Sequence, residues 1–250
     1  MVLLFSGCAG PEAITEFPKA RIDYRALIDT LAARDQLIES VMGRVSVKVE
    51  TPTLETRFSA DYYFAAPDSF RANIRGILGT RPGALVSIGD SVAAYFPAKE
   101  TLFVAVGEPE ETNPVLGLKM GFGGVVRALI GLTGTGFDYD SIVGFQEQAG
   151  IYSLTFTRGD ELVHFEVLPS EWVISSMQLF TIDQEALQDV GYYDFVQRGE
   201  MVRPSRIVIT NPIRGETVNI TIEKEIINQP LPDGLFKLPV PEDVAIWKLI

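Results

Sequence analysis

The sequence predicts a mainly β protein, in which a single antiparallel sheet of about 11–12 strands curls into an unclosed β-barrel around an apolar cavity. Apolar and polar residues alternate with a period of two through most of the chain after Gly43, which indicates strands with one buried face. Only two segments show helical spacing, so few helices are available to cover an apolar sheet face. A two-sheet sandwich is the alternative, and the shortage of helices favours the curled sheet.

The composition allows one substantial core and excludes some partners. With 250 residues, of which 46% are hydrophobic and 22% charged, one large domain is the simplest arrangement. The net charge is −12 and no run of Lys and Arg is dense, so we expect no nucleic acid partner. Because an anionic membrane surface would repel such a chain, membrane association requires an anchor or an apolar loop.

The chain has one cysteine, Cys8, and one histidine, His164. It therefore has no pair for a disulfide and no Cys/His cluster for zinc, and we expect no cofactor and no metal. No segment reaches the about 18 uncharged apolar residues of a membrane-spanning helix. The most apolar stretch, 115–137, contains Lys119 and Arg127.

The first residues indicate localisation to the bacterial envelope. Cys8 follows Phe-Ser-Gly, which looks like a lipobox with Phe5 where Leu is usual, so we expect residues 1–8 to be a remnant signal peptide and Cys8 to carry lipid. Too few residues precede Cys8 for a basic and an apolar region, and we expect the true signal to begin upstream. The polar, Pro-containing segment 9–22 predicts a tether to the membrane. An incidental cysteine is the alternative.

Residues 23–42 predict an amphipathic helix that Gly43 ends. Arg34, Asp35 and Glu39 lie off its apolar stripe. The stripe consists of Tyr24, Leu27, Ile28, Leu31, Ile38, Val41 and Met42.

After Gly43, the period-two pattern predicts a succession of strands. Gly89-Asp90, Gly159-Asp160 and Arg214-Gly215 lie between strands, where hairpin turns are expected. The predicted strands are 45–50, 57–64, 70–75, 84–88, 91–96, 102–106, 142–148, 151–158, 161–168, 172–182, 190–197, 205–210 and 217–226.

The segment 114–132 predicts a second helix, which we interpret as a lid over the sheet. Arg127 lies opposite its apolar stripe, and many glycines weaken the helix by about 1 kcal/mol each. The stripe consists of Leu118, Phe122, Val125, Val126 and Leu129.

Several short motifs follow one another from about residue 25 to 245. After the first helix come Gly-Arg-Val-Ser-Val from Gly43, Phe-Ser-Ala-Asp-Tyr-Tyr-Phe from Phe58 and Ala-Pro-Asp-Ser-Phe-Arg from Ala66. The remaining motifs are Gly-Ile-Leu-Gly from Gly76, Ile-Gly-Asp-Ser from Ile88, Tyr-Phe-Pro from Tyr95 and Leu-Phe-Lys-Leu-Pro-Val-Pro from Leu235. Taken in this order, the motifs resemble those of the LolA/LolB superfamily of bacterial lipoprotein carriers and receptors.

The resemblance implies that residues 23–250 form a domain that holds acyl chains, and that a LolB-like receptor projects an apolar loop toward the bilayer. Ile77 and Leu78 occupy that loop. The soluble carriers have a basic residue before the proline of the second strand, whereas Ala66 precedes Pro67 here, which favours the anchored type. We therefore expect an outer-membrane lipoprotein facing the periplasm, with lipoprotein or lipid acyl chains as ligands and a periplasmic carrier protein as a further partner.

The early strands are expected to line the cavity beneath the lid. Since a buried methylene is worth about 0.8 kcal/mol, moving one acyl chain into water costs on the order of 10 kcal/mol, and a carrier must offer an apolar interior instead. The alternative is that the same side chains fill a solid core. The predicted lining residues are Val45, Val47, Phe58, Tyr62, Phe64 and Ile74.

The sequence does not favour an enzyme. His164 shares a strand face with Leu162 and Glu166, where a structural role is far more common than general base catalysis, and the chain has no nucleophile elbow or Walker-type loop. Asp138 and Asp140 are expected to be turn residues, with calcium as the one cofactor that merits a test. The competing function is an anchored β domain that docks a partner protein in an envelope assembly and takes up no lipid.

Overall fold

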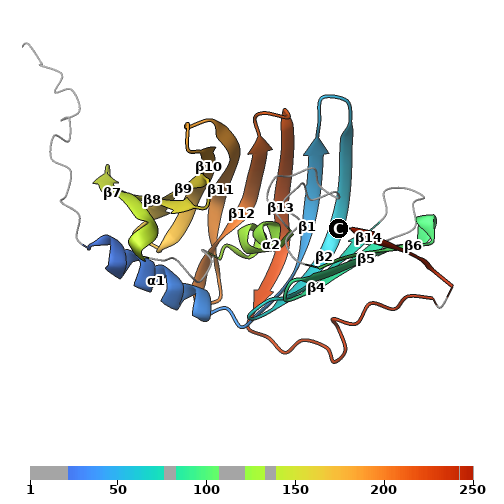
Figure 1. Ribbon diagram of the computed structural model, residues 1–250. Coiled ribbons are helices and arrows are strands. Elements are labelled where there is room, and N and C mark those ends of the chain that lie inside the picture. The colour runs from blue at the N-terminus through green and yellow to red at the C-terminus, as the bar shows by residue number, and fades with distance from the viewer. Residues whose placement is uncertain (1–21, 76–82, 107–121, 133–138, 242, 250) are drawn as a thin grey trace, which may run out of the picture.

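The computed structural model describes residues 22–75, 83–106, 122–132, 139–241 and 243–249. Its strands form one sheet in the order β14-β6-β5-β4-β3-β2-β1-β13-β12-β11-β10-β9-β8-β7. The sheet curls on itself without closing (Figure 1), which confirms the predicted class and excludes the two-sheet sandwich. The strands are β1 (Ser40–Glu50), β2 (Glu55–Ala65), β3 (Ser69–Arg75), β4 (Gly83–Ile88), β5 (Ser91–Phe96), β6 (Thr101–Val106), β7 (Ile142–Gln148), β8 (Ile151–Arg158), β9 (Glu161–Leu168), β10 (Val173–Thr181), β11 (Ala186–Arg198), β12 (Met201–Asn211), β13 (Glu216–Ile227) and β14 (Ala245–Leu249).

The sheet consists of two meanders, β1 to β6 and β7 to β13, joined where β13 pairs with β1. The described strands number 14 rather than about 11–12, and one of the additional strands, β14, pairs parallel with β6. That parallel pair departs from the predicted antiparallel meander, because the chain passes around the sheet edge before it forms β14. Arg71 holds this passing segment on the outer face by donating hydrogen bonds to the carbonyl oxygens of Leu235 and Lys237 at 2.6 and 3.0 Å.

The first helix, α1 (Tyr24–Gln36), begins where the sequence predicts and ends earlier. Asp23 caps it, with its carboxylate accepting a hydrogen bond from the Ala26 amide at 2.8 Å. The expectation that the helix continues to Met42 is wrong, because residues from Ser40 onward pair with β2 and β13. Pairing with a strand on each side satisfies the backbone groups of these residues and buries Val41 in the core, so the sheet overrides the helical spacing of Val41 and Met42.

Gly43 lies inside strand β1 and does not end a helix. A Cβ at this position would lie 2.5 Å from the Lys224 carbonyl oxygen and 2.6 Å from Tyr62 Cε1. The glycine is therefore required by the close approach of the Tyr62 ring across the inner face.

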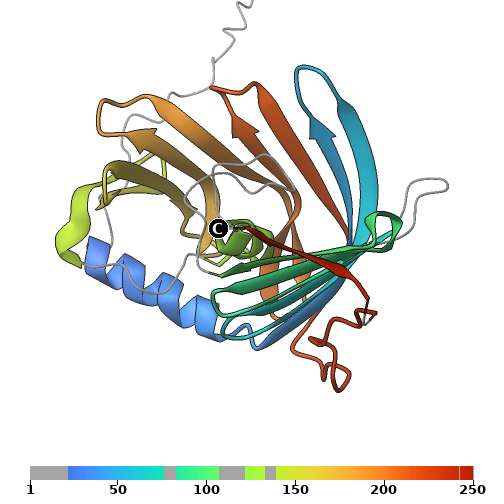
Figure 2. The same cartoon turned by 45° about the vertical axis from the view of Figure 1, so that its right-hand side comes forward.

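The second helix, α2 (Phe122–Ile130), lies in the connection between the two meanders. Figure 2 shows it on the concave side of the sheet, inside the curl, whereas α1 lies across one end of the strands of the second meander. Two short 3-10 turns, η1 (Pro97–Lys99) and η2 (Tyr139–Ser141), complete the fold. Within the described ranges, no helix has the length and apolar character needed to cross a membrane.

Candidate functional site

The concave face of the sheet carries the six residues predicted to line a cavity. Strand register pairs Val47 with Phe58, Val45 with Ala60, and Ala60 with Ile74. Tyr62 and Phe64 follow Ala60 at every second residue of β2, so all six side chains point to the same side. Four are buried, whereas Phe58 and Ile74 are half-buried. The structure thus brings the predicted set onto one face. The four buried residues are Val45, Val47, Tyr62 and Phe64.

Helix α2, which contains part of the predicted lid, packs into this concave face. Val125, Val126 and Leu129 are buried, and Arg127 is exposed. Ala128 and Ile130 are buried as well, so the last two turns of the helix are enclosed on nearly every side. Leu118 and the side chain of Phe122, the remaining predicted lid residues, lie outside the part of the chain that the structure describes.

A buried charged network lies beneath α2. The Arg203 guanidinium on β12 donates hydrogen bonds to both Glu225 carboxylate oxygens, at 2.9 and 3.1 Å, and both side chains are fully buried. The Tyr62 hydroxyl donates to the same carboxylate at 2.5 Å. Burial alone would lower the pKa of Arg203, but the adjacent Glu225 carboxylate outweighs it and the pKa lies above its ordinary value. Burial and the same negative charge raise the pKa of Tyr62 well above its ordinary value.

Two arginines fix the C-terminal end of α2. Arg203 also donates to the Leu129 carbonyl oxygen at 3.1 Å, and Arg34 of α1 donates to the carbonyl oxygens of Gly131 and Val202 at 3.3 and 3.0 Å. Burial, together with the positive charge of Arg203, lowers the pKa of Arg34. Cations near a helix C-terminus stabilise the helix by interacting with its partial negative charge. The network therefore ties α2 to both α1 and the sheet.

Gly131 completes this helix end. Its φ of 67° lies in the left-handed region, and the amides of Gly131 and Leu132 donate to the carbonyl oxygens of Ala128 and Arg127 at 3.2 and 2.9 Å. These two bonds form a Schellman motif, in which glycine is favoured. A Cβ on Gly131 would also lie 2.7 Å from Nη1 of Arg203, so the glycine lets the guanidinium reach the helix end.

None of the network residues except Tyr62 was among the residues predicted from the sequence to form a site. A signal existed on β12, where Arg203 falls on the same face as Met201, Ile207 and Ile209, but the predicted strand began two residues after it. On β13 the alternation of Val218, Ile220 and Ile222 would point Lys224 inward. A β-bulge beside Val45 shifts the register by one residue and turns Glu225 inward instead.

A second feature of the concave face is an aromatic row formed by Phe96, Phe103 and Trp247. Ring centroids lie 6.1 Å apart for Phe96 and Phe103 and 6.4 Å apart for Phe103 and Trp247. Register with β5 and β14 places this row on the inner face, yet Phe96 and Phe103 are only half-buried and Trp247 is 62% exposed. The row is therefore apolar inner surface that the protein's own packing leaves partly open.

Other predicted sites fall outside this face or outside the description. Cys8, Ile77, Leu78 and Asp138 lie among the residues that are not described. His164 points to the outer face, where its Nδ1 lies 2.9 Å from the Thr155 hydroxyl oxygen. Among the described residues, no three His, Cys, Asp or Glu side chains are grouped so that they could hold a metal ion.

Comparison with solved structures identifies the fold as that of LolA superfamily proteins. A LolA superfamily protein from Nitrosomonas europaea aligns over 87% of this chain and 98% of its own, with 14% identity and a TM-score of 0.62. A DUF1329 family protein from Desulfovibrio piger aligns over 85% of this chain and 96% of its own, with 11% identity and a TM-score of 0.65. A putative outer membrane lipoprotein-sorting protein domain from Vibrio parahaemolyticus aligns over 84% of this chain and 94% of its own, with 12% identity and a TM-score of 0.62. No protein-family model and no curated protein sequence matches the chain.

Proposed function

We propose that this protein binds the acyl chains of lipids or lipoproteins on its concave face, beneath and beside α2. The observation that carries the proposal is the aromatic row of Phe96, Phe103 and Trp247, whose inner surface remains partly open next to a closely packed apolar face. An acyl chain that covers this row gains about 0.8 kcal/mol for each methylene removed from water. No catalytic group is needed for such binding, and the proposed role is that of a carrier or receptor rather than an enzyme.

The fold supports this proposal through its solved relatives, one of which is described as a lipoprotein-sorting domain. In the proposed cycle, Cys8 carries a lipid that anchors the protein to the outer membrane, and residues 9–22 tether the domain on the periplasmic side. Ile77 and Leu78 contact the bilayer, and a periplasmic carrier protein delivers the cargo. Since the acyl chain passes from one apolar environment to another, the net free-energy change of each transfer can be small.

Native mass spectrometry with lipid extraction tests the proposal directly. The full-length Cys8→Ser variant, exported to a bacterial periplasm behind a cleavable signal peptide and purified without detergent, should carry lipid or acylated peptide in stoichiometric amount. A clean mass of the unliganded protein, together with no uptake from offered lipids, would refute acyl-chain binding and favour the docking-module alternative.

A pair of adjacent residues provides a matched comparison of the two sheet faces. Phe103 and Val104 are both half-buried neighbours on β6, but Phe103 points to the concave face and Val104 to the convex face. Phe103→Asp should abolish lipid retention, whereas Val104→Asp should leave it unchanged. Phe64 is less suitable for this test, because it is only 2% exposed and a charge there would disrupt packing before it disrupted binding.

The loop hypothesis has its own experiment. Leu78→Glu should leave the circular dichroism spectrum and lipid retention unchanged and impair delivery of bound cargo to vesicles. Full delivery by this variant would remove the loop from the mechanism without affecting the acyl-binding proposal.

A further inference from the structure

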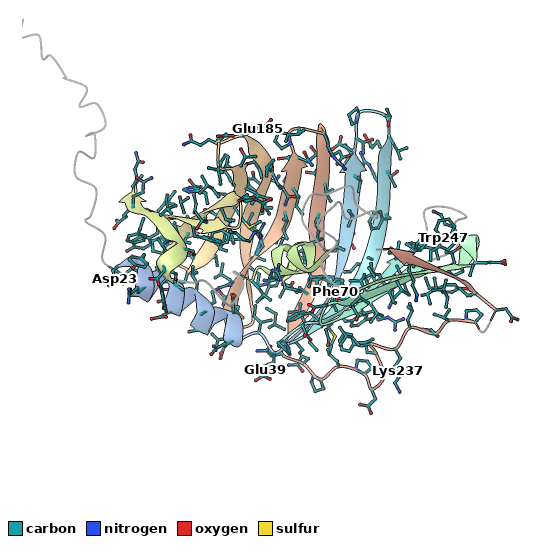
Figure 3. The ribbon with its side chains drawn as sticks, in the orientation of Figure 1. Asp23, Glu39, Phe70, Glu185, Lys237 and Trp247 are labelled. Atoms are coloured by element: carbon teal, nitrogen blue, oxygen red, sulfur yellow. The ribbon has the colours of Figure 1, made fainter. Side chains whose placement is uncertain are left out.

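Three neighbouring hairpins each expose one aliphatic side chain at the turn. Leu54 in the β1–β2 turn is 62% exposed, Ile213 in the β12–β13 turn is 57% exposed and Ile182 in the β10–β11 turn is 61% exposed. The strands of these hairpins occupy six consecutive positions in the sheet, in the order β2-β1-β13-β12-β11-β10. Figure 1 shows the three turns at the same end of the sheet, and Figure 3 marks this end with Glu185 of the β10–β11 turn.

Turn chemistry does not account for this arrangement. Hairpin turns favour Gly, Asn, Asp, Pro and Ser, because these residues adopt the required backbone conformations or bond to the turn. The turns at the opposite strand ends, at 66–68, 89–90, 149–150, 169–172 and 199–200, contain no Leu, Ile, Val or Met. The β8–β9 turn at the same end, Gly159-Asp160, contains none either. Among the described turns that join two strands, those that expose a Leu, Ile, Val or Met side chain are thus the three that connect the six central strands at one end.

The spacing of the three side chains indicates what could cover them together. Adjacent hairpins are two strands apart, so neighbouring tips lie about 10 Å from each other and the three span about 20 Å. Side chains at this spacing do not form one contiguous apolar patch. A broad apolar layer can take up all three at once, and the acyl region of a bilayer just below the headgroups is such a layer.

The charges around the tips specify the headgroup chemistry. The β10–β11 turn contains Asp183 and Glu185 and no basic residue, whereas the β12–β13 turn contains Arg214 beside Ile213. Beside Leu54, Glu55 is already paired with Lys48 and Arg57, at 3.3 and 3.0 Å. The tips therefore carry charges of both signs, and the net charge of −12 would repel an anionic surface from the protein as a whole, so a zwitterionic surface fits best.

We propose that Leu54, Ile182 and Ile213, the aliphatic rim, dock the protein on a zwitterionic lipid bilayer by shallow insertion. The strand ends that carry the rim then face the membrane, and α1, which lies at the opposite end of the second meander in Figure 1, faces away from it. Binding of this kind depends on apolar contact, so neither salt nor anionic lipid strengthens it. The inference concerns membrane contact and does not require that the concave face bind an acyl chain.

Co-sedimentation with phosphatidylcholine vesicles tests the rim. The full-length Cys8→Ser variant, which cannot be lipid-modified, should bind these vesicles. Since burying an exposed Leu or Ile side chain corresponds to about a tenfold gain in partitioning, the triple variant L54S/I182S/I213S should lose binding to below detection. A matched control is L37S/V143S/I246S, whose residues are 61%, 60% and 62% exposed at other places on the surface. The control should bind as the parent does.

A fluorescence measurement locates the contact. Cys8 is the only cysteine, so C8S/L54C carries a single label position at the rim, and C8S/L37C carries one away from it. A polarity-sensitive fluorophore should shift to shorter wavelength on vesicles at position 54 and not at position 37. In the vesicle experiment, the proposal is overturned if the rim variant binds as the parent does, if the control variant loses binding equally, or if binding requires anionic lipid. In the fluorescence experiment, it is overturned if the emission shifts equally at positions 54 and 37. Lipid content of the rim variant, measured by mass spectrometry, should be unchanged, and this separates failure of the rim from failure of acyl-chain binding.

Discussion

The two faces of the sheet use arginine–carboxylate pairs in opposite ways. On the concave face, Arg203 and Glu225 are fully buried. On the convex face, Asp61 accepts from Arg44 at 2.8 Å and from Arg75, and these arginines are 46% and 55% exposed. The inner pair links β12, β13 and α2, whereas the outer group links only neighbouring strands of the first meander. The inner pair therefore determines the position of α2, whereas the outer group adds little stability to strands that are already paired through their backbones.

The largest expected effect comes from breaking the inner pair. Arg203→Met leaves the Glu225 carboxylate buried without its countercharge, which costs about 3–5 kcal/mol of unfolding free energy. Urea unfolding followed by circular dichroism measures the loss. Arg75→Met on the outer face is the matched control, with an expected loss of about 1 kcal/mol or less. Equal losses in the two variants would contradict the distinction between the faces.

A double variant sharpens the same comparison. R203M/E225Q removes both charges, so it should be less destabilised than the sum of R203M and E225Q. The difference measures the coupling between the two side chains. Additive losses would mean that Arg203 acts mainly through the carbonyl oxygen of Leu129.

The next effect concerns the hydroxyl of Tyr62. Tyr62→Phe keeps the ring packed and removes one hydrogen bond to a buried carboxylate, which should cost about 1.5–3 kcal/mol. Val47→Ala, a buried change on the neighbouring strand, is a check that the assay reports inner packing losses of comparable size. No loss in Tyr62→Phe would mean that Arg203 alone satisfies Glu225.

Glycine substitutions compare tight and open parts of the sheet. Gly43→Ala places a Cβ against the Lys224 carbonyl oxygen and the Tyr62 ring, and should cost about 1–3 kcal/mol. Gly144→Ala on β7 places its Cβ 3.5 Å from Thr155, an ordinary contact, and should be neutral or slightly stabilising. Thermal unfolding of both variants measures the contrast, which a similar loss in each would refute.

The smallest effect is expected on the outer face and depends on pH. Burial alone would raise the pKa of Asp61, but its hydrogen bonds with Arg44 and Arg75 outweigh burial and the pKa lies below its ordinary value. The folded state therefore gains stability above the ordinary pKa of a carboxyl, about 4, and loses it as the pH falls through the lowered pKa. Asp61→Asn should cost about 0.2–1 kcal/mol at neutral pH. Unfolding curves of both proteins should converge in acid, and a gap that persists there would exclude ionisation of Asp61 as the cause.

Much of the fold follows from the sequence because strand periodicity is a local property. The alternation of Phe58, Ala60, Tyr62 and Phe64 defines a face whatever lies opposite, and the structure places all four on the concave side. The hairpin turns and the start of α1 are also local, and each occurs where the sequence predicts it. The end of α1 was not predictable in this way, because β2 and β13, which recruit residues from Ser40 onward into the sheet, are distant in sequence.

In the candidate site, too, the features that depend on local residue spacing were predictable and those that depend on contacts between distant residues were not. Residue spacing alone was enough to predict the strands, their apolar inner face and an apolar helix at Val125 to Leu129, since each of these depends on the spacing of residues within one segment. The inward direction of Glu225 depends on strand pairing, because a bulge in the pairing of β1 with β13 changes which residues of β13 face inward. Only the tertiary structure decided that Arg203 and Arg34 meet at the end of α2, and that Trp247 joins the aromatic row through a parallel pairing. These contacts join residues far apart in the chain, and no local pattern encodes their distance.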